Sequence, residues 1–168
     1  MTIDSRINPP QTGDERAMLV AFLDYQRATL ELKCAGLTDD QLRELSTPPS
    51  QISLLGLLRH MADVETWWFG IRFAKLDLPS IFDPLEVNAD FEELDSMPPA
   101  EVLAVFRANC ARSREIVAAA ASLEDLGMRG DGSPASLRWI ILHMIEEYAR
   151  HNGHADLVRE RVDGATGA

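Results

Sequence analysis

The stretch "RWIILHMIEEYARHNGHADLVRE", residues 138–160, joins an apolar run directly to a run of ionisable side chains. Successive residues of an α-helix rotate by about 100°, because one turn holds about 3.6 residues. Relative to His143, Glu147 then lies at about 40°, His151 at about 80° and His154 at about 20°. Apolar residues of the same stretch share this stripe. A helix here therefore turns ionisable groups toward the interior, where a carboxylate is costly unless it is paired, hydrogen-bonded or bound to a metal.

The rest of the chain also shows helical periodicity, and no segment shows the alternation of a strand. Long helices are predicted for residues 14–35, 53–75 and 99–123 and from Ser133 or Ser136 to about Val162, with a short helix that starts at Thr38. Four long helices in a chain of this size predict an all-α fold, a four-helix bundle. Bundles form cofactor and metal sites in their core, from side chains on facing helices.

The segments between the helices carry start and stop signals. "TDDQ", residues 38–41, matches a capping box, and Gly36 and "DGATG" at 163–167 are typical helix ends. Ser96 is the expected cap of the third long helix, and "DLGMRGDGSP" at 125–134 is interpreted as a turn. Residues 76–97 form a long acidic connection between the second and third long helices, a length typical of functional rims, of lids or of segments that hold short elements of their own.

Length and composition indicate a soluble globular protein. The 168 residues fit a single domain, 1–168, with a helical core of about 12–163. We find no signal peptide and no apolar segment of membrane-spanning length, so we expect a cytoplasmic protein that does not enter the membrane. Cys34 and Cys110 form no CxxC pair, and we expect both to be reduced core residues.

The charge balance bears on the partners of the protein. The chain has 27 acidic and 16 basic residues, a formal net charge of −11. Because binding to phosphate backbones depends on clustered Lys and Arg, we predict that the protein does not bind nucleic acid. Salt-dependent binding to duplex DNA at physiological ionic strength would refute this. Homodimer formation is left open, since no stripe on the predicted helices requires it.

Three residues form a candidate metal site. Glu147 and His151 are one turn apart and could hold one cation from a single helix. His60 lies on an apolar face of the second long helix, in "LLGLLRHMADVE" at 54–65. Two imidazoles and one carboxylate bind a divalent ion and leave coordination positions open. The alternative also stands: a hydrogen-bonded Glu–His pair needs no metal, and a lone histidine on such a face is more often a core residue than a ligand.

Two motifs resemble a known superfamily. "SLLGLLRHMADVETWWF" at 53–69 and "SLRWIILHMIEEYARHNGHADLVRERVDGATG" at 136–167 are similar to DinB-like proteins, and in particular to the mycothiol-dependent transferases, which include the maleylpyruvate isomerases. The resemblance extends from the first helix to the terminal "DGATG". It implies a four-helix bundle with a divalent metal, zinc before nickel, and mycothiol as co-substrate.

The resemblance also implies the ligands. One histidine comes from the second helix of such proteins and two ligands four residues apart come from the last, which places them at His60, Glu147 and His151. His151 opens "HNGH" where many relatives read "HRGQ". Many members have a histidine at the position of Glu147, and glutamate there is similar to the mycothiol-dependent branch. The ligand set thus favours mycothiol over bacillithiol.

The expected activity is a metal-dependent transfer of a low-molecular-weight thiol to an electrophilic substrate. A free thiol is mostly protonated at neutral pH, while coordination to a divalent ion favours the nucleophilic thiolate. Neither cysteine of the chain lies in the motifs, so neither is expected to be catalytic. Three alternatives remain: a thiol-dependent isomerase, a metal-dependent hydrolase that uses water instead, and a metal-binding bundle without catalytic activity.

Other side chains have a structural and a functional interpretation. His143 lies one turn before Glu147 and is either a core residue or a hydrogen-bonding partner of a ligand, with the core favoured. His154 is expected beside the ligands or in the pocket. Trp67, two turns beyond His60, is either core or pocket lining.

The charged residues near the motifs are more simply interpreted. Arg150 and Arg138 could contact an anionic substrate, but ion pairing in solvent is the safer interpretation. Asp63 and Glu65 are expected at the surface or beside the metal ligands.

Overall fold

The computed structural model describes Asp4 and residues 6–79 and 90–166. This part of the chain is mostly helical, with one small antiparallel sheet. Its elements are α1 (Glu15–Cys34), α2 (Asp39–Arg43), α3 (Leu54–Glu65), η1 (Thr66–Phe73), α4 (Pro99–Ala119), β1 (Leu126–Met128), β2 (Pro134–Ser136) and α5 (Leu137–Asp163). The prediction of a helical protein is confirmed, and the two short strands are an addition to it.

The ends of the helices follow the expected signals. Thr38 and Gln41 form the predicted capping box of α2, in which each side chain bonds the other residue's backbone. The Ser53 and Ser136 side chains cap α3 and α5, accepting from the Gly56 and Trp139 amides. α5 ends at a left-handed Gly164 (φ 79°), a conformation that glycine adopts without steric cost.

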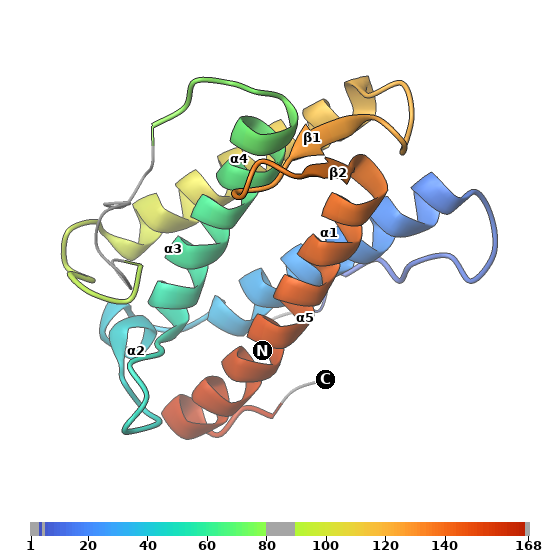
Figure 1. Ribbon diagram of the computed structural model, residues 1–168. Coiled ribbons are helices and arrows are strands. Elements are labelled where there is room, and N and C mark those ends of the chain that lie inside the picture. The colour runs from blue at the N-terminus through green and yellow to red at the C-terminus, as the bar shows by residue number, and fades with distance from the viewer. Residues whose placement is uncertain (1–3, 5, 80–89, 167–168) are drawn as a thin grey trace.

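The helices pack in pairs. α1 packs along α5, α3 packs along α4, and α3 also contacts α5. Figure 1 shows α3 and α5 in front, with α1 and α4 behind them. The core between them is apolar, with leucines from α1 and α3, Phe106 from α4, and Ile140, Ile141 and Met144 from α5. One side of α3 therefore lies opposite one side of α5.

A polar cluster lies inside this core. Glu65 of α3 is fully buried, and its two carboxylate oxygens accept hydrogen bonds from Arg27 of α1, each of 2.7 Å. The hydroxyl of Tyr148 donates to Glu65 as well, at 2.8 Å. The sequence placed Glu65 at the surface or beside the metal ligands. It instead links α1, α3 and α5 inside the core, because a buried guanidinium offers its carboxylate a bidentate partner.

Some element bounds differ from the predictions; α4, predicted to run to about Leu123, ends at Ala119. Residues 125–134 were expected to form a turn, but β1 and β2 pair there, with Gly127 opposite Ala135. Strands of three residues are too short to show alternation in the sequence. α4 begins after Pro98 with no side-chain cap, because the Ser96 hydroxyl accepts a hydrogen bond from Arg59 instead.

The helix that contains α3 continues as a π-helix, η1, up to Phe73. The hairpin docks on this segment, so closely that a Cβ atom at Gly127 would lie 2.8 Å from the Arg72 carbonyl oxygen. Figure 1 shows the hairpin beside the start of α5. π-Helical turns often occur at functional sites, and this one lies beside the pocket described below.

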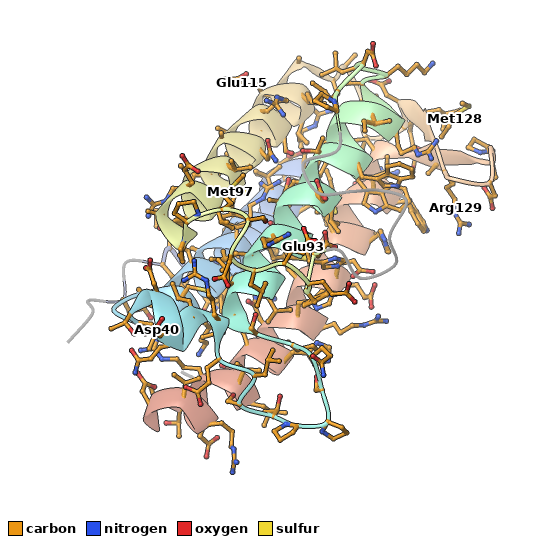
Figure 2. The ribbon with its side chains drawn as sticks, turned by 90° about the vertical axis from the view of Figure 1, so that its left-hand side faces the viewer. Asp40, Glu93, Met97, Glu115, Met128 and Arg129 are labelled. Carbon is orange, nitrogen blue, oxygen red and sulfur yellow. The ribbon has the colours of Figure 1, made fainter. Side chains whose placement is uncertain are left out.

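The long connection of 76–97 lies partly outside the described residues, which omit 80–89. Its described end rests on α3, where the backbone carbonyl of Glu93 accepts a hydrogen bond of 2.9 Å from Arg59 (Figure 2). Among the helices of the described residues, none is both long and apolar enough to cross a membrane.

Candidate metal centre

His60, Glu147 and His151 come together where α3 faces α5. Each offers one ligand atom, and the three atoms lie within 4.8 Å of one another. The His60 and His151 rings are 4.8 Å apart between centroids and meet edge to face. A carboxylate oxygen of Glu147 lies 3.4 Å from Nε2 of His151. Residues 87 positions apart in the sequence thus form one cluster of nitrogen and oxygen donors.

Helical geometry places this cluster at the margin of the core. Met144 and Tyr148 of α5 are fully buried. Glu147 follows Met144 by three residues, and His151 follows Tyr148 by three. Three residues rotate by about 300°, so each side chain points about 60° away from the buried residue before it. Their side chains are accordingly part-buried, with exposed fractions of 19% and 13%, and that of His60 is 25% exposed. The stripe predicted to face the interior faces its edge instead, which leaves an approach for a ligand.

Asp90 completes the surroundings of His60. One carboxylate oxygen of Asp90 lies 2.9 Å from Nδ1 of His60, so Nδ1 donates its proton there and Nε2 is left for a metal. Phe91 packs on the same imidazole and fills the space that a Cβ atom at Gly56 would need. Sequence reasoning missed Asp90, because it lies in an irregular segment 30 residues away and has no periodic relation to His60.

His154 stands behind His151. Their Nδ1 atoms are 3.4 Å apart, so one neutral ring can donate to the other and leave Nε2 of His151 toward Glu147. Burial, together with the neighbouring His60, His154 and Arg150, lowers the pKa of His151 to about 4. His151 is therefore neutral at physiological pH, the state in which an imidazole binds a metal.

His143 lies in an aromatic cluster that the sequence did not indicate. Its ring stacks on Trp139 at 5.0 Å and meets the edge of Trp68 at 4.8 Å. Its Nε2 lies 3.7 Å from the other carboxylate oxygen of Glu147. His143 is thus part-buried between tryptophans and also beside Glu147, so it combines both interpretations drawn from the sequence.

An open pocket adjoins His60. Its volume is about 440 Å³, and its described lining includes His60, Asp63, Trp67, Ile71 and Asp90. Trp67 is 41% exposed, so it is a pocket wall here rather than a core residue.

The two arginines singled out in the sequence are engaged elsewhere. Arg150 pairs with Glu146 at 3.2 Å, and Arg138 pairs with Glu15 and Glu124. These ion pairs match the safer of the two interpretations.

Both cysteines are free and buried, as expected. Burial raises the pKa of Cys34 and of Cys110 to about 12. Neither thiol is ionised at neutral pH, so the chain offers no thiolate nucleophile of its own from these residues.

The donor set fits a divalent cation. Two imidazoles and one carboxylate suit zinc and related ions, and three protein ligands leave a position for a small molecule. The imidazole–carboxylate contact between His60 and Asp90 is the kind of support that metal-bound histidines usually have. No hydrogen bond from the described part of the chain reaches the Glu147 carboxylate, so its charge lacks an internal donor.

Comparisons with known proteins give a family match and a similar fold. A family model described as mycothiol-S-transferase matches residues 18–164. A solved structure, described as the crystal structure of the conserved protein of locus from Enterococcus faecalis, has a similar fold. It has a TM-score of 0.65 at 18% identity, over 92% of this chain and 100% of that one. A search of curated proteins finds no match.

Proposed function

The chain belongs to the mycothiol-S-transferase family, and from this premise we propose that it is a metal-dependent transferase that joins mycothiol to an electrophilic substrate. The observation that carries the proposal is the cluster of His60, Glu147 and His151, whose ligand atoms lie within 4.8 Å of one another beside an open pocket. The family name supports the thiol, and the donor set supports the metal.

In this proposal His60, Glu147 and His151 hold a divalent ion, zinc in the first place and nickel as the alternative. A bound divalent ion supplies an open position that favours the thiolate form of a small thiol at neutral pH. The two histidines bind in their neutral form, and Glu147 contributes the negative charge that offsets the cation. Asp90 fixes the tautomer of His60 through the contact at Nδ1.

The remaining residues shape the surroundings of the reaction. His154 contacts His151, and His143 lies beside Glu147, so both help to hold these side chains in place. Trp67 forms a wall of the pocket for the electrophile. Arg150 neutralises Glu146 at the rim of the site. Because burial keeps Cys34 and Cys110 protonated, the sulfur that attacks the electrophile comes from the small thiol and not from these side chains.

We also propose that α1, α3 with η1, α4 and α5 form a DinB-like four-helix bundle, a single domain over 1–168 with its core at about 12–163. The pairwise packing of these helices supports this. We further propose that the protein acts in the cytoplasm.

The proposal is tested with cobalt in place of the native metal. Addition of mycothiol should produce a sulfur-to-cobalt charge-transfer band, and the thiol should titrate on the protein below its free pKa. His60→Ala, which removes one ligand, is the matched control and should show neither effect. If mycothiol leaves the spectrum unchanged while a simple carboxylate alters it, the open position serves water, and hydrolysis becomes the better proposal.

A further inference from the structure

Arg72 carries a positive charge that no carboxylate of the described residues pairs with. Its Nε atom is buried and has no hydrogen-bond partner, and within the described residues no carboxylate lies at ion-pairing distance from its guanidinium. The chain has 27 acidic and 16 basic residues. Arg16, Arg112 and Arg161 also have no carboxylate partner among the described residues, but each donates to another acceptor. Six other arginines illustrate the usual arrangement, because each pairs with a carboxylate: Arg27, Arg107, Arg114, Arg138, Arg150 and Arg159.

The position of Arg72 is nevertheless well defined. The centre of its guanidinium lies 3.8 Å from the centroid of the Trp67 ring. The two residues are five apart in η1, where π-helical hydrogen bonds join residue i to residue i+5 and bring such residues over one another. An arginine stacked on an aromatic face keeps its edge of N–H donors available to a planar anion.

The β1–β2 hairpin closes over this pair. A Cβ atom at Gly130 would lie 3.8 Å from Nη2 of Arg72 and 3.9 Å from the Trp67 ring. The next residue back, Arg129, places a second guanidinium 5.2 Å from the Trp139 ring, at the hairpin end of the molecule (Figure 2). The stacked pair is therefore held between η1 and the hairpin before any ligand binds.

Trp67 connects Arg72 to the metal centre. One end of the 440 Å³ pocket is His60 with Asp63 and Asp90, and Trp67 belongs to the other end of the same lining. Seven helical residues separate His60 from Trp67, a rise of about 10 Å. The pocket thus has an acidic end at the metal centre and, about 10 Å away along the helix, an end that adjoins the Arg72 guanidinium.

We propose that Arg72, stacked on Trp67, binds a carboxylate of the electrophilic substrate and so directs its reactive carbon toward the metal end of the pocket. This inference rests on the proposed function and adds the class of substrate: an electrophile that carries an anionic group away from the carbon attacked.

The binding step is tested without any reaction. Zinc-loaded protein is titrated by calorimetry with p-toluate and with its neutral counterpart p-toluamide. The wild type should bind the carboxylate about 10-fold more tightly or better, as expected for a charge-assisted bidentate contact. Arg72→Gln should make the two affinities equal, and Arg72→Lys should keep part of the preference. Arg107→Gln removes the same charge from an exposed pair on α4 and should keep all of it.

Two results overturn the inference. Equal binding of both compounds by the wild type shows that no anion is recognised. A preference that survives in Arg72→Gln shows that the carboxylate binds the metal or another cation.

Turnover separates the inference from the proposed function. p-(Bromomethyl)benzoate and p-(bromomethyl)benzamide are supplied with mycothiol; the sulfur–carbon bond forms, the carbon–bromine bond breaks, bromide leaves, and the thiol proton passes to solvent. The ratio of their kcat/KM values should favour the benzoate by about 10-fold in the wild type, and in Arg72→Gln this advantage should be lost. Turnover of both without preference overturns the inference and leaves the function standing. If neither is turned over, the function fails, and the calorimetry still decides the role of Arg72.

Discussion

Glu65 and Glu147 are two carboxylates with opposite surroundings, one inside the core and one at its edge. Glu65 is fully buried and receives hydrogen bonds from Arg27 and from Tyr148. Glu147, the residue before Tyr148, is part-buried, and its carboxylate lies 3.4 Å and 3.7 Å from the imidazoles of His151 and His143. No described residue donates a hydrogen bond to it. The chain supplies partners for the first carboxylate, and in the proposed function an external cation would be the partner of the second. Whether a buried charge has an internal partner therefore separates a structural role from a binding one.

The largest effect is expected at the internally completed carboxylate. Glu65→Gln keeps the shape of the side chain but removes the buried bidentate partner of Arg27, whose guanidinium then retains only its contact with the part-exposed Asp24. Breaking one side of a buried ion pair typically costs about 3–5 kcal/mol, and we expect a loss of this size in the free energy of unfolding, measured with urea. Arg27→Met together with Glu65→Leu removes both charges and should recover much of it. A loss below about 1 kcal/mol for Glu65→Gln would make the two carboxylates alike.

The second prediction concerns the metal. Replacing His60, Glu147 or His151 by Ala should greatly lower metal content, measured by elemental analysis of protein purified without added metal. The helical circular dichroism should persist, because the three side chains lie at the edge of the core. Glu147→Gln should weaken metal binding while costing the metal-free protein less than about 1 kcal/mol, since no internal donor is lost. Full stoichiometric metal in His151→Ala would contradict the assignment of His151 as a ligand.

A smaller effect on metal affinity is expected at Asp90, which contacts the proposed ligand His60. Asp90→Asn weakens the acceptor that orients His60, and losses of such contacts typically lower metal affinity by about 10–100-fold. Competition with a chelator measures the affinity. Asp95→Asn, in the same segment but paired with Arg43, is the matched control and should leave the affinity unchanged. Equal affinities in Asp90→Asn and the wild type would remove Asp90 from the site.

The smallest effect is the titration of the metal-free site. The pKa of His151 is lowered from 6.5 to about 4, chiefly by burial. Because the folded-state pKa lies below the unfolded one, the unfolded chain takes up the proton first, and stability falls as the pH drops from 6.5 toward 4. NMR of the imidazole resonances follows this directly. A midpoint near 6.5 for His151 would show that the site is open to solvent rather than part-buried.

The sequence predicted more of the scaffold than of the site's surroundings. Caps such as Thr38 and Ser136 could be predicted because they act within a few residues. The stripe of Glu147 and His151 followed from helical periodicity, and His60 could be singled out because it lies on an apolar face of its helix. Asp90, Glu65 and Arg72 were missed or misplaced, since their roles depend on contacts between segments distant in the chain. A buried charge gives no local sign of whether another helix supplies its partner.

The π-helical segment η1 also bears on how the chain could change in length. Its hydrogen bonds join residue i to i+5, one residue further than in an α-helix, so deletion of one residue within 66–73 would let an ordinary α-helix form there. His60 lies before this segment and would keep its place opposite α5, whereas the stacking of Arg72 on Trp67 depends on the five-residue spacing. If Arg72 selects the substrate as proposed, a one-residue deletion would alter which compounds bind in the pocket while His60 stayed beside Glu147 and His151. Length variation here would then redirect selectivity and preserve the proposed chemistry.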